Sequence, residues 1–180
     1  SIHYDQIGCG NSSALSSEQV RALSMDFFLD ELENLIEFLG ISSDYILLGH
    51  SWGGMVAQEF ALRQPDGLRA IILSSSLASA AAWVSEVQRL AARLPDGFGE
   101  LYQSMVAGAE LSNEDYFALD SAFTRQHIIR SEPNWVDSGF TYPNAVYYTL
   151  WGRSEFEFDG SFGNWSVTNR LSEITVPTLS

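Results

Sequence analysis

Residues 44–54 read Asp-Tyr-Ile-Leu-Leu-Gly-His-Ser-Trp-Gly-Gly, and this stretch decides the fold. The apolar run at 44–48 is typical of a strand that is buried on both faces. The pattern Gly-x-Ser-x-Gly follows at once over 49–53, and the apolar residues of 55–62 then predict a helix. A strand, a tight turn between glycines and a helix, in this order, present a serine hydroxyl at the end of the strand.

The sequence on either side continues the alternation of strand and helix. A second apolar run predicts a buried strand at 68–73, and residues 174–180 begin a further strand. Residues 2–7 predict a short strand that runs into a Gly/Asn/Ser turn at 8–13. Leucine and isoleucine at helical spacing predict a helix over 17–39. Strands that alternate with helices through short turns indicate a parallel sheet covered by helices.

The chain changes character near residue 79. Helices are predicted at 80–94, 98–107, 113–130 and 144–151. Of the 23 aromatic residues, 16 lie between Trp83 and Trp165, where they either pack a core or line an apolar pocket under a helical lid. We therefore predict an α/β core over 1–78, a helical cap over 79–165 and a return to the core over 166–180.

Composition excludes several classes of protein. The 180 residues are 46% hydrophobic and 18% charged, as in a soluble globular domain. A net charge of −14 and nine scattered basic residues argue against nucleic acid, and no apolar run is long enough for a membrane span. The N-terminal residues do not resemble a signal peptide, and the single cysteine predicts a reducing, cytoplasmic location without disulfides. We expect no metal and no cofactor, and the oligomeric state stays open.

Ser51 is the candidate nucleophile. Glycines two positions to either side allow the tight turn, and the start of the following helix favours negative charge. The backbone N–H of Trp52 is then one donor to the oxyanion, while the Trp52 side chain lines a pocket or packs under the lid. His50 is expected to pack rather than to act as the base, because neighbours on such a turn point apart. The alternative is a tight turn without catalysis.

Four separated motifs resemble the proline iminopeptidases, which are α/β-hydrolases with a helical cap. They are Tyr4-Asp5-Gln6-x-Gly8-Cys9-Gly10-x-Ser12, Gly49-His50-Ser51-Trp52-Gly53-Gly54-Met55, Trp151-Gly152-Arg153-Ser154-Glu155-Phe156 and Ile174-x-Val176-Pro177-Thr178-Leu179. The resemblance extends over nearly the whole chain. It implies a serine aminopeptidase that releases N-terminal residues, often proline, from small peptides through an acyl-enzyme on Ser51.

The same resemblance implies that Glu155 binds the free α-amino group of the substrate. A partly buried carboxylate facing an ammonium makes a charge-assisted hydrogen bond and selects a free N-terminus. The alternative is an ordinary solvated glutamate. Glu157 and Asp159 are weaker candidates for the same role, and Cys9 is either a thiol at the pocket rim or a small buried residue.

The remaining catalytic groups are expected outside this sequence. In the α/β-hydrolase order the acid and then the base follow the serine, and family members carry them beyond the position of Ser180. The second oxyanion donor is expected before residue 2. His3, His50 and His127 are not expected to replace the base, so we predict that the chain is an internal fragment without activity of its own.

Two other functions stay open. An esterase, lactonase or amidase of the same fold has no need for an amine-binding carboxylate, so Glu155→Gln separates it from an aminopeptidase. A binding protein that kept the fold without its catalytic groups is the alternative outside enzymes.

Overall fold

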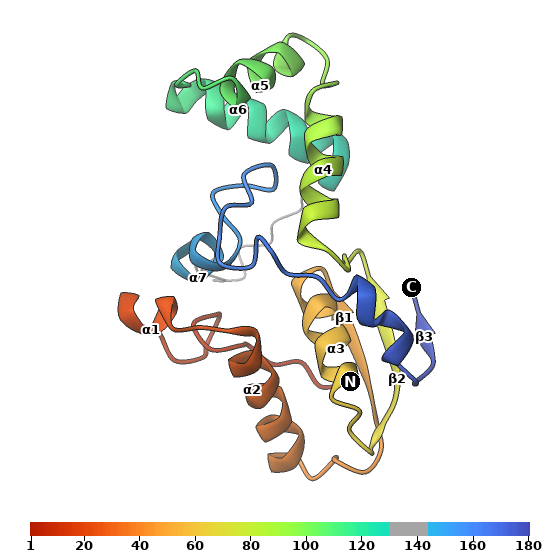
Figure 1. Cartoon of the computed structure of the whole chain (residues 1–180). Helices are drawn as coiled ribbons and strands as arrows, with labels where there is room; N and C mark the ends of the chain where they lie inside the picture. Colours follow the sequence, from red (N-terminus) through yellow and green to blue (C-terminus); the bar gives the residue numbers. More distant parts are fainter. Residues whose placement is uncertain (130–143) are drawn as a thin grey trace.

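The computed structural model describes residues 1–129 and 144–180. Three parallel strands form one sheet in the order β1-β2-β3, with helices packed against it (Figure 1). The strands are β1 (Tyr45–His50), β2 (Leu68–Ser74) and β3 (Thr178–Leu179). The helices of this half are α1 (Ser17–Arg21), α2 (Met25–Phe38) and α3 (Trp52–Leu62). The helix α3 connects β1 to β2, as a parallel pair requires, so the predicted α/β architecture is confirmed.

Only one face of the sheet is covered. Tyr45 and Leu47 pack into the apolar cluster that includes side chains of α2 and α3. Ile46 and Leu48 alternate with them, point to the other face and are 58% and 68% exposed. The prediction that 44–48 is buried on both faces is therefore wrong, because no segment within the described ranges covers the second face of β1.

Two further predictions for the N-terminal region are wrong. Residues 2–7 contain no strand, because the backbone N–H of Ile7 donates to the carboxylate of Glu31 at 2.7 Å rather than to a neighbouring strand. The helix predicted over 17–39 is divided into α1 and α2. Ser24 interrupts it with an extended backbone, φ −134° and ψ 167°, and its hydroxyl accepts an N–H of the first turn of α2 at 3.2 Å.

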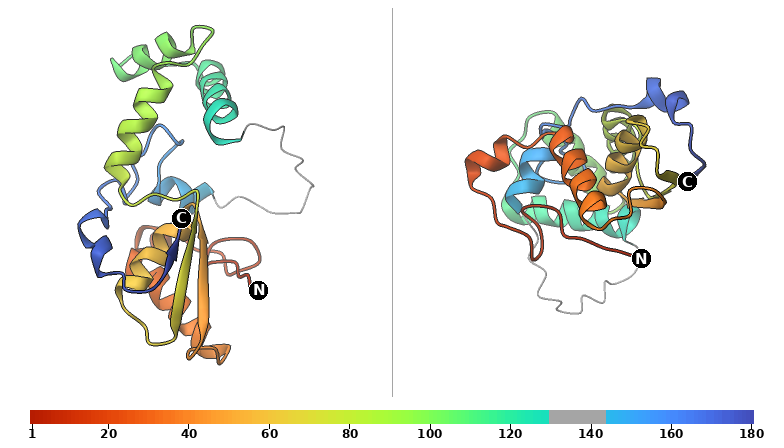
Figure 2. Two further views of the ribbon diagram at one scale, coloured as in Figure 1. Left: turned by 90° about the vertical axis from the view of Figure 1, so that its right-hand side faces the viewer. Right: turned by 90° about the horizontal axis from the view of Figure 1, so that it is seen from below.

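A second group of helices follows β2. It comprises α4 (Ala80–Ala91), α5 (Phe98–Val106), α6 (Asn113–Phe123), the π-helical turn η1 (Thr124–Ile128) and α7 (Asn144–Leu150). The helices α4, α5 and α6 stand apart from the sheet and enclose an apolar cluster of their own (Figures 1 and 2). The predicted helix 113–130 ends as an α-helix at Phe123 and continues as η1. Arg130, the last residue of that predicted helix, lies outside the described ranges. So do three of the 16 aromatic residues counted above, Trp135, Phe140 and Tyr142.

The segment from α7 to Phe162 contacts both halves of the chain. Val146, Leu150 and Phe162 belong to the apolar cluster of the sheet half. Phe156, from the same segment, belongs to the cluster of α4, α5 and α6. In Figure 1 the helix α7 accordingly lies between the sheet half and the helices α4, α5 and α6. Side chains on this segment are thus placed between the sheet and these three helices.

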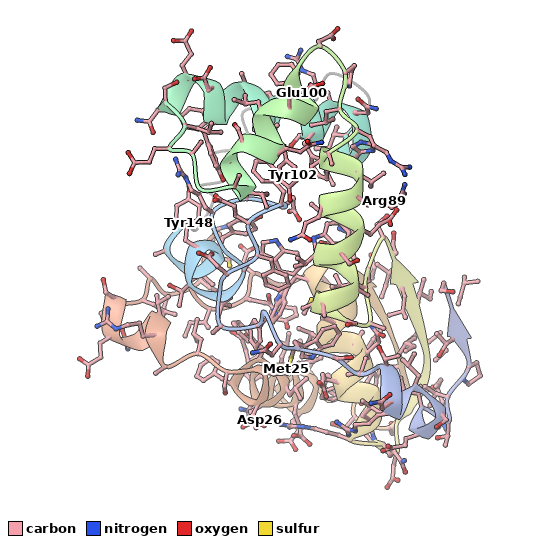
Figure 3. The ribbon with its side chains drawn as sticks, turned by 45° about the horizontal axis from the view of Figure 1, so that its top comes forward. Met25, Asp26, Arg89, Glu100, Tyr102 and Tyr148 are labelled. Carbon is pink, nitrogen blue, oxygen red and sulfur yellow. The ribbon has the colours of Figure 1, made fainter. Side chains whose placement is uncertain are left out.

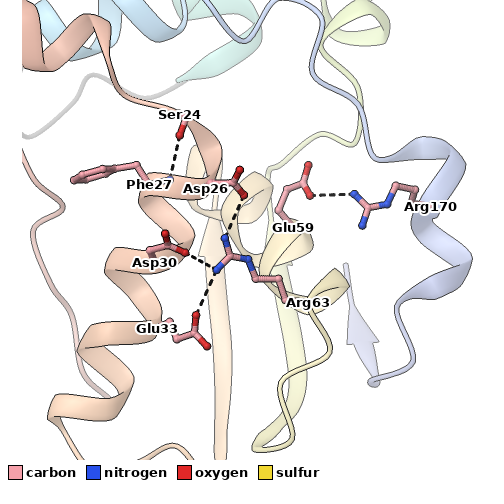
Figure 4. Close-up of polar contacts among 8 residues, drawn as sticks. All are labelled: Ser24, Asp26, Phe27, Asp30, Glu33, Glu59, Arg63 and Arg170. Carbon is pink, nitrogen blue, oxygen red and sulfur yellow. Dashed lines mark hydrogen bonds and ion pairs between the residues drawn. The ribbon is translucent and has the colours of Figure 1, made fainter.

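Arg63, the C-cap residue of α3, binds three acidic residues of α2. Its guanidinium lies 3.2 Å from Asp26, 2.7 Å from Asp30 and 3.4 Å from Glu33 (Figure 4). The three carboxylates are largely exposed, so each pair contributes little to stability. Together they fix the position of α2 against α3, which carries the serine turn at its start.

The chain returns to the sheet half through Trp165 and the 3-10 helix η2 (Thr168–Glu173). The indole N–H of Trp165 donates to Glu59 of α3 at 2.8 Å, and its carbonyl accepts the N–H of Ala80 at 2.9 Å. Arg170 of η2 lies 3.5 Å from the same Glu59 carboxylate (Figure 4). These contacts bring the start of α4, α3 and the approach to β3 together.

Two negative findings apply to the described ranges. None of their helices is both long enough and apolar enough to cross a membrane. Nor do these residues contain a group of three or more His, Cys, Asp or Glu side chains that could hold a metal ion.

Candidate active site

Ser51 joins β1 to α3 in a backbone conformation that residues other than glycine rarely adopt, with φ 51° and ψ −119°. Its N–H donates to the carbonyl of Ser74 at 3.0 Å. Its carbonyl accepts the N–H of Gly54 at 2.9 Å and the hydroxyl of Ser76 at 2.9 Å. The backbone of Ser51 is therefore held by three hydrogen bonds while the residue stays exposed.

The turn needs glycine at two positions for lack of space. A Cβ on Gly49 would lie 2.2 Å from the carbonyl oxygen of Gly53, and a Cβ on Gly54 would lie 2.3 Å from Oγ of Ser76. A Cβ on Gly53 would meet nothing within 4 Å. The steric demand expected from the two glycines that flank Ser51 thus falls on Gly49 and on Gly54, not on Gly53.

The groups around Oγ of Ser51 suit a developing negative charge. Trp52 begins an 11-residue helix, and the N–H groups of a first helical turn have no partner inside the helix. Such N–H groups, with the helix dipole, favour an anion at this end. No side chain in the described part of the chain makes a hydrogen bond to Oγ of Ser51, so the hydroxyl is free to meet a ligand.

A cavity of about 250 Å³ opens beside Ser51. Its walls are mostly apolar and come from the N-terminal segment, α2, the serine turn, α7 and the loop after α7. The lining residues are Gln6, Cys9, Phe28, Ser51, Trp52, Val146, Tyr147, Leu150, Trp151, Glu155 and Phe162. Both expectations for the aromatic residues therefore hold, because Trp151 and Phe162 line the cavity whereas Tyr102 and Phe123 pack in a core.

Glu155 is the one acidic side chain among the described residues that lines this cavity. The hydroxyl of Tyr147 donates to its carboxylate at 3.1 Å, and the indole N–H of Trp83 donates to its backbone carbonyl at 3.2 Å. Trp151, from the adjacent wall, has a buried indole N–H that makes no hydrogen bond of good geometry to any described residue. No Lys, Arg or His of the described ranges forms an ion pair with Glu155, so a cationic ligand would meet an uncompensated carboxylate.

The surroundings shift the pKa of Glu155 upwards. Burial is the largest cause, and the negative charge of Asp120 adds to it. The hydrogen bond from Tyr147 and the nearby indole of Trp151 act in the opposite direction, because both favour the charged carboxylate. A carboxyl group with a pKa perturbed in this way, inside a cavity, is a typical feature of a functional site.

Comparison with known proteins identifies the family of the chain. The sequence profile of the alpha/beta hydrolase fold matches residues 1–163 of the 180. The chain belongs to the alpha/beta hydrolase fold family. The strand, serine turn and helix of this chain form the local structure in which that fold presents a nucleophile.

Proline iminopeptidases are among the relatives of this chain. It is 35% identical to the proline iminopeptidase of Lactobacillus delbrueckii subsp. lactis, covering 99% of this chain and 62% of the relative. It is 34% identical to that of Saccharolobus solfataricus, covering 99% and 58%. The crystal structure of VinJ superposes with a TM-score of 0.87 at 37% identity, covering 98% of this chain and 61% of VinJ. The crystal structure of the Mycobacterium smegmatis proline iminopeptidase superposes with a TM-score of 0.82 at 34% identity, covering 98% of this chain and 60% of that protein. The chain spans about three fifths of the length of these relatives.

The two other acidic candidates, Glu157 and Asp159, lie elsewhere. The carboxylate of Glu157 accepts the hydroxyl of Tyr116 at 2.5 Å and so faces α6. Asp159 is exposed, and neither residue lines the cavity. Of the three carboxylates considered from the sequence, the structure brings only Glu155 into the cavity with Ser51.

The histidines do not meet Ser51. His3 is exposed and hydrogen-bonds to the hydroxyl of Ser1 at 3.2 Å. His50 is exposed at the end of β1. His127 lies in η1 with its ring 5.1 Å from that of Phe123, and its Nε2 is buried without a partner among the described residues.

Cys9 lies in the cavity wall, half-buried, so its position fits both expectations for this thiol. Burial raises the pKa of Cys9, and the carboxylates of Glu31 and Asp5 raise it further. The thiolate is therefore disfavoured at neutral pH, and the position does not suit a nucleophilic cysteine.

Two polar residues of the cavity were not predicted from the sequence. Gln6 accepts the indole N–H of Trp52 at 2.9 Å, which fixes the ring of Trp52 in the wall. Tyr147 is the hydroxyl donor to Glu155. A periodic pattern in the sequence reveals neither pair. Gln6 and Trp52 are 46 positions apart, and Tyr147 lies in α7 whereas Glu155 follows the end of that helix.

Proposed function

We propose that this chain forms the nucleophile and the amine-binding subsite of a serine aminopeptidase of the proline iminopeptidase type. The observation that carries the proposal is the placement of Ser51 and Glu155 in one cavity with apolar walls. A dipeptide end fits such a site with its first carbonyl at Ser51, its side chain against the aromatic wall and its ammonium at Glu155. The relationship to proline iminopeptidases supports the same assignment.

In the proposed reaction Oγ of Ser51 attacks the carbonyl carbon of the first residue. The N–H of Trp52 donates to the oxyanion that forms, and the collapse of this intermediate expels the rest of the peptide and leaves an acyl-enzyme. Water then releases the first residue. The scheme needs a histidine within hydrogen-bond reach of Oγ, as base and then as acid. We place this histidine and its supporting carboxylate in polypeptide beyond Ser180, and we expect the 180 residues alone to be inactive.

The proposed selectivity for a free N-terminus follows from the charge of Glu155. Its carboxylate already accepts a hydrogen bond from Tyr147 and has no cation among the described side chains. An ammonium group would supply the missing positive charge through a charge-assisted hydrogen bond. An acylated N-terminus would leave the carboxylate buried and unpaired, which is the costly arrangement.

Glu155→Gln tests the proposal in the protein as its gene encodes it. The kcat/KM for a prolyl arylamide should fall about 10- to 100-fold, because a hydrogen bond to a charged group is worth about 1.5–3 kcal/mol. Hydrolysis of a simple aryl ester without an amine should change little. Asp159→Asn, an exposed neighbour outside the cavity, is the matched control and should leave both substrates unaffected.

An equal loss on both substrates, or none on the arylamide, would overturn the amine-binding role of Glu155. The apolar walls of the cavity would also suit the acyl group of an ester. In that case the esterase, lactonase or amidase function would be the better one. A protein that hydrolyses neither substrate would instead fit a binding protein.

A further inference from the structure

We propose that Tyr116 of α6 is a positioning residue, which holds the turn around Glu155 and so sets where its carboxylate lies in the cavity. This inference rests on the proposed amine-binding role of Glu155. Tyr116 does not line the cavity and would not touch the substrate. It would act through the backbone of residues 153–157.

The segment that carries Glu155 is a tight turn outside the regular helices. Ser154 and Glu157 form an antiparallel bridge, with the N–H of Glu157 3.3 Å from the carbonyl of Ser154. Glu155 and Phe156 lie within this turn. A short turn of this kind has few hydrogen bonds of its own, so contacts from outside decide its position.

One side chain makes contact on both flanks of Glu155. The hydroxyl of Tyr116 donates to the carboxylate of Glu157 at 2.5 Å. The guanidinium carbon of Arg153 lies 3.8 Å from the centre of the Tyr116 ring, a cation–π contact. The ring of Phe156 packs against the same tyrosine, with centroids 5.7 Å apart. Three of the five residues of the turn therefore rest on Tyr116.

The chemistry of these contacts suits a permanent clamp. Tyr116 is only 5% exposed, and burial, followed by the hydrogen bond to Glu157, raises its pKa far above the usual range. The raised pKa favours the protonated phenol, which is the form that donates to Glu157. Arg153 lies over the face of the ring and Glu157 accepts its hydroxyl. Because these two partners carry opposite charges, the clamp adds no net charge beside Glu155.

Tyr102 of α5 offers a matched control (Figure 3). It is 4% exposed and its ring also packs on Phe156, with centroids 6.0 Å apart. Its hydroxyl makes no hydrogen bond to any described residue. Burial raises the pKa of Tyr102, and the negative charge of Glu157 raises it further. Replacing either tyrosine by phenylalanine removes one buried hydroxyl, but only at Tyr116 does a bond to the turn disappear.

The test compares Tyr116→Phe with Tyr102→Phe in the protein as its gene encodes it. For a prolyl arylamide, Tyr116→Phe should raise KM about 3- to 10-fold with little change in kcat, as loss of one hydrogen bond to the turn predicts. For an aryl ester without an amine, neither constant should change. Tyr102→Phe should leave both substrates as they are. Arg153→Met, at an exposed position where misfolding is no concern, should act in the same direction as Tyr116→Phe and more weakly.

A double-mutant cycle with Glu155→Gln separates this inference from the proposed function. If Tyr116 acts through Glu155, Tyr116→Phe has no further effect once Glu155 is glutamine. An equal effect in both backgrounds, or an equal loss on arylamide and ester, would show a merely structural tyrosine and overturn the positioning role while the function stands. If Glu155→Gln itself spares the arylamide, the proposed function fails, and the positioning role fails with it.

Discussion

The Glu155 carboxylate lies in a cavity with mostly apolar walls and, among the described residues, accepts one hydroxyl group, that of Tyr147. Burial without an opposite charge disfavours its ionised form, which is why its pKa is raised. The charged form is also the form that would bind an ammonium. The surroundings therefore oppose the charged form of the residue, and a bound ammonium would relieve that penalty.

A pH profile reports this balance. The ionised carboxylate is lost as the pH falls through the raised pKa of Glu155, so kcat/KM for an amine substrate should fall on the acid side. Tyr147→Phe removes a hydrogen bond that lowers this pKa, so the acid limb should move to higher pH. The alkaline limb is set by the substrate amine, whose pKa is about 8, and its midpoint should not change.

An aryl ester provides the control for this profile. The histidine base titrates with either substrate, whereas Glu155 matters only to the amine. The shift in Tyr147→Phe should therefore appear with the arylamide and not with the ester. The same shift with both substrates would mean that Tyr147 acts on the base and not on Glu155.

The residues of the site differ in how far the sequence could predict them. Ser51 follows from a local pattern, because a strand, two glycines and a helix occupy consecutive positions. The position of Glu155 in the cavity agrees with the prediction from motif resemblance, while its role stays a prediction. Gln6 and Tyr147 could not be found in this way, since each acquires its partner only when the N-terminal segment or α7 packs against the sheet half.

At the scale of elements, the junction of β1 and α3 positions Ser51, the proposed nucleophile. Gly49→Ala would put a Cβ against the backbone carbonyl of Gly53, whereas Gly53→Ala would put one into open space. We expect Gly49→Ala to lower the free energy of unfolding by about 2 kcal/mol or more and to abolish activity, because a backbone clash at a strained turn must move Ser51. Gly53→Ala, inside the first turn of α3, should be neutral or slightly stabilising.

Denaturant unfolding and an ester assay on the two alanine variants check this prediction. The pair is matched, because each variant adds one methyl group and they lie two residues to either side of Ser51. If both variants lost stability equally, the steric argument at Gly49 would be wrong. If Gly53→Ala were stable but inactive, its methyl group would instead obstruct the oxyanion site.

Elements defined by local pattern agree best with the sequence analysis. β1 and β2 lie within two residues of the predicted strands, because continuous apolar runs specify them. The break between α1 and α2 was missed, because Ser24 competes as an N-cap within an otherwise helical pattern. The strand at 2–7 was predicted wrongly, because a strand needs a neighbour and this segment binds a helix side chain. The division at residues 78 and 165 stays a prediction.

At the scale of the whole molecule, one face of β1 is not covered by any of the described residues. Ile46 and Leu48 are more than half exposed on β1. Relatives with the same fold are longer, and this chain spans about three fifths of their length. Exposed apolar side chains on an open sheet promote association between molecules.

The double substitution Ile46→Thr and Leu48→Thr should therefore act in opposite directions in two contexts. In the 180-residue chain by itself it should increase the soluble fraction and decrease binding of a hydrophobic dye, since apolar surface is removed and little packing is lost. In the protein as its gene encodes it, the same change should lower the free energy of unfolding by about 1–3 kcal/mol for each residue, if further polypeptide packs on this face. Val106→Thr on α5, 63% exposed and away from the sheet, is the control and should have little effect in either context. A stability unchanged by the double substitution in the gene product would show that this face stays open to solvent there, and the surface would then have to be explained by a partner rather than by the fold.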